Sequence, residues 1–187
     1  FEDDEDVLCV SCRNPLHYRA KDGSSYFFSS IPNFGHSMAI WKRSWLLYDE
    51  SLKTWENIIQ NGGMSSYIRD NKLSNISSSL YSKIYSNVLP KAWDHIFSIA
   101  FFCHKGKAIV PSYHLVEADG FDEHGQHMNK ESAFRIFHID KKLESMPFPL
   151  IHPSSKDIDY NFEKIMRRRK HGLKALINKY IQIVLRK

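Results

Sequence analysis

The sequence predicts an α+β fold in which an antiparallel sheet of hairpins is packed by intermediate helices and followed by a basic amphipathic C-terminal helix. Two pairs of apolar, β-branched and aromatic runs are each divided by a short polar break, which is typical of hairpins. Between and after them, apolar residues recur at three- and four-residue steps, the period of a helix. The 187 residues, 42% of them hydrophobic, suffice for one sizeable core. We expect a mixed core domain over residues 1–152 and a basic helical segment over residues 153–187, packed on that core or extending from it.

The first hairpin is expected over residues 35–51, with its polar break at Lys42-Arg43-Ser44. Met38, Ile40, Trp45 and Leu47 are available for a buried face. The strand of residues 26–31 precedes it. This arrangement places His36 at the start of one strand and Asp49 at the end of the other.

The middle of the chain predicts two helices and a second hairpin. Apolar residues at helical spacing indicate a helix over residues 50–60, which Asn61-Gly62-Gly63 ends. A Ser- and Asn-rich stretch over residues 64–80, which is expected to be a loop or a weak helix, precedes a second helix, which Pro90 ends. Residues 96–102 and 107–116 are expected to form strands joined by a turn at residues 104–106, and residues 133–139 a further strand.

The C-terminal helix has its apolar residues on one face and basic residues on the other. Ser154 or Ser155 is a suitable N-cap, and Gly172 favours a bend that makes one long helix and two shorter ones equally good interpretations. The segment of residues 156–187 holds ten Lys or Arg against three acids. A run of four cations within it can neutralise the phosphates of a nucleic acid, contact an anionic membrane surface or a partner protein, or form the solvated face of a docked helix: Arg167, Arg168, Arg169 and Lys170.

Composition and charge indicate the cellular compartment in which we expect this protein. No run of about 18 apolar residues exists, so we expect no transmembrane segment, and the acidic start from Glu2 to Asp6 is unlike the basic beginning of a signal peptide. Three cysteines do not make a disulfide framework. We therefore expect an intracellular, reducing compartment, either the cytoplasm or the nucleus.

Metal and cofactor motifs are weak. Cys9 and Cys12 have the spacing of a zinc knuckle, but no second pair completes it. The segment from His114 to His127 holds the residue types of a divalent-metal site without an ordered pattern, and a solvated loop explains it better. The sequence also has no phosphate-binding Gly loop and no Gly-x-Ser-x-Gly elbow. We assign neither a cofactor nor a metal site.

The predicted hairpin suggests one piece of chemistry. Neighbouring strands lie about 4.8 Å apart, so a carboxylate at Asp49 can accept the imidazole N–H of His36. That contact fixes the tautomer and stabilises the imidazolium that forms when the ring takes a proton from a nucleophile. A solvated pair at a strand edge is the alternative interpretation.

The run Tyr26-Phe27-Phe28-Ser29-Ser30-Ile31-Pro32-Asn33-Phe34-Gly35-His36, followed by Trp45 and Tyr48-Asp49-Glu50-Ser51, resembles the His-box region of ubiquitin-specific proteases, which are papain-like cysteine peptidases. Residues 96–102 are similar to the last apolar strand of those domains. The resemblance implies that His36 is the general base and Asp49 its orienting partner. No Asn-x-x-Cys motif precedes His36, and Cys12 is the upstream thiol we nominate.

Two classes of function follow. The first is a papain-like thiol hydrolase domain, either active or a degenerate remnant that binds a ubiquitin-like or other protein partner without cleaving it. The second is a non-enzymatic scaffold or nucleic-acid-associated protein that binds through its basic C-terminal helix.

Overall fold

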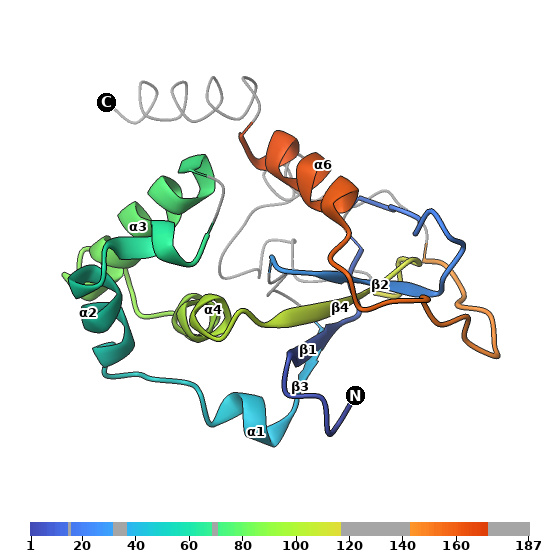
Figure 1. Ribbon diagram of the computed structural model, residues 1–187, viewed down its shortest axis with the longest axis horizontal. Helices are drawn as coiled ribbons and strands as arrows, with labels where there is room; N and C mark the ends of the chain where they lie inside the picture. Colours follow the sequence, from blue (N-terminus) through green and yellow to red (C-terminus); the bar gives the residue numbers. More distant parts are fainter. Residues whose placement is uncertain (15, 32–36, 69–70, 117–142, 172–187) are drawn as a thin grey trace, which may run out of the picture.

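The computed structural model describes residues 1–14, 16–31, 37–68, 71–116 and 143–171, and for residues 167–171 it describes the backbone alone. Figure 1 shows a layer of helices beside a small sheet, with one more helix lying across the sheet. The elements in chain order are β1 (Val7–Ser11), β2 (Tyr26–Ser29), β3 (Met38–Ile40), α1 (Lys42–Trp45), α2 (Lys53–Gln60), the 3₁₀ turn η1 (Gly63–Ser66), α3 (Asn71–Tyr85), α4 (Trp93–Cys103), β4 (Lys107–Pro111) and α6 (Tyr160–His171).

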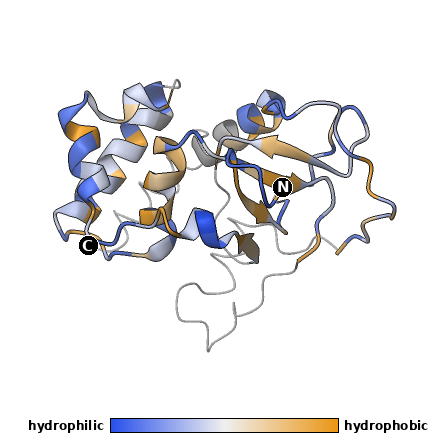
Figure 2. Cartoon of the chain, turned by 60° about the horizontal axis from the view of Figure 1, so that its bottom comes forward, coloured by the Kyte–Doolittle hydropathy of each residue, from blue (hydrophilic) through white to orange (hydrophobic). Residues whose placement is uncertain are grey.

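The expected α+β content is confirmed, but the prediction of an antiparallel sheet is wrong. The four strands lie in the order β2-β4-β1-β3. β2 pairs antiparallel with β4 and β3 pairs antiparallel with β1, whereas the two central strands, β1 and β4, run parallel. β1 itself was not expected, although its run of apolar residues is bounded by acids before it and by Arg13 and Asn14 after it. The strands carry most of the hydrophobic colouring on their side of the molecule (Figure 2).

The first predicted hairpin does not form. β3 pairs with β1, in the register Cys9 with Ile40 and Ser11 with Met38, and the expected returning strand is replaced by α1. The Arg43 side chain explains this difference, because it donates to the backbone carbonyls of Phe1, Glu2, Asp4 and Val7, just before or at the start of β1. This long-range contact holds α1 at the amino end of β1 and cannot be seen in a local window of sequence.

The second predicted hairpin is also wrong in its first half. Residues 96–102 lie within α4, whose residues Ile96 to Phe101 are all buried. α4 packs on two sides, with Ile96 and Ile99 in the helical core and Phe101 against Leu8 and Ala108 of the sheet. A run buried on two sides loses its helical periodicity, so it resembles a buried strand. β4 confirms a shorter second strand, and residues 133–139 lie outside the described part of the chain.

The helical layer has its own apolar core. α2 confirms the helix expected over residues 50–60, and its end coincides with the positive φ angles of Gly62 and Gly63, 92° and 76°. α3 begins at Asn71, within the Ser-rich stretch, and ends at Tyr85 rather than at Pro90. The buried side chains of this core are Leu52, Trp55, Ile58, Met64, Ile68, Tyr81, Ile84, Ile96 and Ile99.

α6 lies across β2 and β4, where Phe162 and Met166 pack against Phe27 and Val110. It begins at Tyr160 rather than near Ser154 or Ser155, because Asp159 is the cap: its Oδ1 accepts the backbone N–H groups of Asn161 and Phe162, both at 3.0 Å. The bend expected at Gly172 lies outside the described residues. In the described ranges no helix combines the length and the apolar character that crossing a bilayer requires.

Candidate functional site

The parallel strands β1 and β4 direct the residues that follow them to one edge of the sheet. Cys12 follows β1, and its backbone N–H donates to the Ser37 carbonyl at 3.0 Å. Ser112 follows β4, and its backbone N–H donates to the Ser25 carbonyl at 2.9 Å. Ligands and reacting groups commonly gather beyond the carboxyl ends of parallel strands. This carboxyl edge, defined by the segments 12–19, 112–114 and 143–144, is therefore the candidate site.

Asn14 shapes the loop that leaves β1. Its side chain is buried; Nδ2 donates to the Tyr18 carbonyl at 2.6 Å, and Oδ1 accepts the Tyr18 backbone N–H at 3.0 Å. The loop closed in this way holds His17 with a φ of 50°. The Tyr18 hydroxyl then donates to Asp159 at 3.0 Å, so the same loop is tied to the start of α6.

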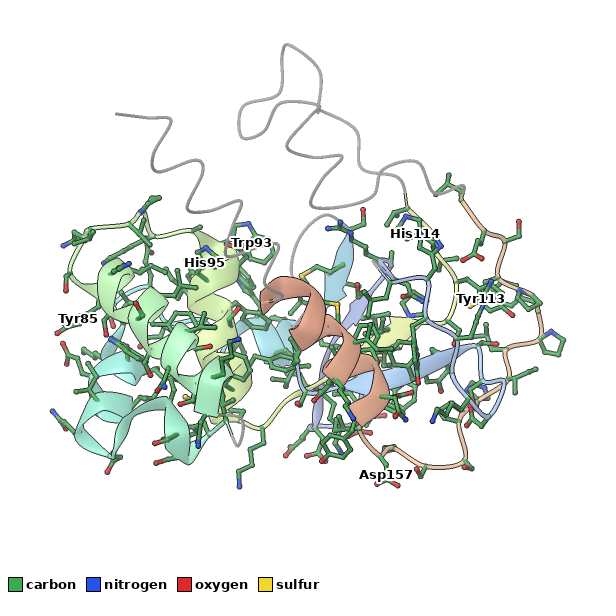
Figure 3. All side chains as sticks on the ribbon, turned by 90° about the horizontal axis from the view of Figure 1, so that it is seen from above. Tyr85, Trp93, His95, Tyr113, His114 and Asp157 are labelled. Atoms are coloured by element: carbon green, nitrogen blue, oxygen red, sulfur yellow. The ribbon has the colours of Figure 1, made fainter. Side chains whose placement is uncertain are left out.

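Two imidazoles and a carboxylate meet at the carboxyl edge. The rings of His17 and His114 lie 4.5 Å apart between centroids with an interplanar angle of 34°. Glu144 accepts the backbone N–H of His114 at 2.7 Å, lies 3.8 Å from Nδ1 of His17 and forms an ion pair with Arg19 at 2.5 Å. Arg19 also stacks over Tyr113, 4.1 Å from the ring centre. Figure 3 shows Tyr113 and His114 together at this end of the sheet, away from Trp93 and His95 of α4.

The three cysteines differ in burial. Cys9 lies within β1 against Phe101 and Ala108, and burial raises the pKa of its thiol to about 12. Burial likewise raises the pKa of Cys103, at the end of α4, to about 11. Both thiols therefore stay protonated at neutral pH and are poor nucleophiles. Cys12 is half-buried and lies at the carboxyl edge, and none of the three cysteines forms a disulfide.

Asp49 serves as a helix cap. Its two carboxylate oxygens accept the backbone N–H groups of Ser51 at 3.1 Å and of Thr54 at 2.8 Å, together with both hydroxyls, at the start of α2. Burial acts to raise the pKa of Asp49, but these hydrogen bonds outweigh it and leave the pKa below its ordinary value. The chain reaches Asp49 through α1, at the amino end of β1, whereas Ser37 lies at the carboxyl end. The strand pairing that was expected to bring Asp49 to His36 is absent.

The remaining predicted site residues are only partly placed. His36 lies outside the described residues, but Ser37, the next residue in the sequence, is the backbone partner of Cys12. The backbone of Arg167, Arg168, Arg169 and Lys170 lies in the last described turn of α6.

No metal cluster is found in the parts of the chain that the structure describes: no three His, Cys, Asp or Glu side chains there are arranged to hold an ion. Cys9 and Cys12 illustrate the reason, because the first thiol is enclosed by the core while the second follows the end of the strand.

Sequence reasoning missed three members of the carboxyl edge, namely His17, Arg19 and Glu144. His114 was noted only as part of a polar loop. One usable signal existed, since His114 lies near the end of the strand predicted over residues 107–116, and polar residues at strand ends often line sites. No local pattern connects Glu144 to either imidazole, because the contact joins segments that are distant in the sequence.

Comparison of the chain with protein-family models, with curated proteins and with solved structures gave no match, so the residues of the carboxyl edge must carry any functional conclusion by themselves.

Proposed function

We propose that this chain is a papain-like thiol hydrolase domain, active or degenerate, with Cys12 as its nucleophile. The observation that carries the proposal is the hydrogen bond from the Cys12 backbone to Ser37, at an edge of the sheet that also holds His17 and His114. A nucleophilic thiol needs an imidazole within reach to take its proton, and this edge gathers both kinds of group.

The proposed reaction is acyl transfer from an amide or isopeptide. The thiolate of Cys12 attacks the carbonyl carbon, the C–N bond breaks, and the imidazolium returns its proton to the departing amine. Water then attacks the thioester, releasing the carboxylic acid and restoring the thiol. His36, from the resemblance, and His114, from the structure, are the two candidate bases. A protein substrate, including one carrying a ubiquitin-like modifier, is the partner we propose, in a reducing compartment such as the cytoplasm or nucleus.

A thiol-directed probe tests this proposal. The full chain is incubated with ubiquitin or a short peptide bearing a C-terminal electrophile, and adducts are located by peptide mass spectrometry. We expect an adduct on Cys12, its loss in Cys12→Ser, and its retention in the matched control Cys103→Ser. Labelling that falls on Cys103, or that survives in Cys12→Ser, contradicts the proposal.

The degenerate form of the same function has its own readout. If the domain binds its protein partner without cleaving it, Cys12→Ser leaves the affinity for ubiquitin unchanged when binding is measured by titration calorimetry. Absence of both the adduct and the binding would remove the hydrolase proposal in each of its forms.

A second candidate function is nucleic-acid binding through α6. One observation favours it: Phe162 and Met166 pack on the sheet, and the four consecutive cations follow them in the last described turn of the helix. The apolar face of α6 is buried in the protein's own core. A partner that binds α6 would therefore contact its charged side chains. Such contacts favour a polyanion.

Salt dependence tests the second candidate. Binding of a short RNA or DNA should weaken with salt, by about one log unit per log of salt for each phosphate neutralised. Replacing Arg167, Arg168, Arg169 and Lys170 by Gln should reduce that slope by about 3 to 4. A control with equal charge loss replaces four exposed lysines elsewhere: Lys53, Lys72, Lys83 and Lys91. Equal slopes in the two variants would contradict a role for α6.

A further inference from the structure

We draw no further inference here: the strongest candidate, the exposed aromatic patch where Trp45 of α1 meets Trp93 at the start of α4, is an unpartnered apolar face, and nothing in the structure shows what covers it.

Discussion

The helical layer and the carboxyl edge of the sheet are built from opposite kinds of side chain. The helical core contains apolar and aromatic groups, and Trp55 Nε1 is the one buried side-chain nitrogen or oxygen of the described residues that has no hydrogen-bond partner. The carboxyl edge joins Asn14, His17, His114 and Glu144 through hydrogen bonds and charge. The difference teaches that one region is held together by apolar burial and the other by paired polar groups, because buried polar groups are costly unless each is satisfied.

The largest expected effect lies in the helical core. Trp55→Ala should lower the free energy of unfolding by about 3 to 5 kcal/mol, because it removes a fully buried indole and leaves a cavity between α2 and α3. Urea denaturation followed by circular dichroism measures the loss. Trp55→Phe is the control: it removes the unpaired Nε1 but keeps an aromatic ring, so it leaves a smaller cavity and should cost less than Trp55→Ala. Similar losses in both variants would contradict the cavity as the cause of the destabilisation.

A smaller loss is expected where the sheet meets α6. Glu163 is buried, and its Oε1 accepts the backbone N–H and the hydroxyl of Ser30, both at 2.7 Å. Glu163→Ala leaves these donors without that acceptor, so the free energy of unfolding should fall by about 1 to 3 kcal/mol. Lys164→Ala, at the next and exposed position, is the matched control and should change it by less than about 0.5 kcal/mol. Equal effects at the two positions would show that α6 is not held by this carboxylate.

The cap of α2 should contribute less again. Asp49→Ala should cost about 1 kcal/mol, the usual value for a lost N-terminal cap. Because the folded-state pKa of Asp49 is lowered, its stabilising contribution is present above the ordinary carboxyl pKa of about 3.9 and is lost as the pH falls through the folded value. Urea titrations at several pH values should therefore show wild type and variant converging below about pH 4. A difference in the free energy of unfolding between wild type and variant that persists below about pH 4 would contradict the capping role.

The smallest expected effect is at the surface of the sheet. Lys107 forms an ion pair with Asp6 at 3.2 Å, but the Asp6 side chain is 67% exposed. Lys107→Gln should change the free energy of unfolding by less than about 0.5 kcal/mol, because water and salt screen an exposed pair. The backbone hydrogen bond from Lys107 to Asp6, 2.7 Å long, remains in the variant. A loss above 1 kcal/mol would show that this end of β4 depends on the side chain.

Local patterns predicted those elements whose signals are local. The period of α2 and the glycines that end it lie within a dozen residues, and both were confirmed. The apolar run of α4 was mistaken for a strand because both of its sides are buried. The segment after β3 was mistaken for a returning strand because the carbonyls that hold Arg43 lie about 40 residues earlier in the chain.

The candidate site divides in the same way. Cys12 could be nominated from its position before His36, and Asp49 could be recognised as a carboxylate with a structural or chemical task. The contacts of His17 and His114 with Glu144 join segments separated by 30 to more than 100 residues. The spacing of residues along the sequence therefore does not predict these contacts.

By itself the sequence determined the α+β content, the local helix at residues 53–60 and the concentration of basic residues near the C-terminus, because propensity, glycine and charge act over a few residues. Only the tertiary structure decided that β1 and β4 run side by side and parallel, and therefore which polar groups share an edge. Strand pairing depends on complementary surfaces that the folded chain brings together, and those surfaces exist only after distant segments have packed.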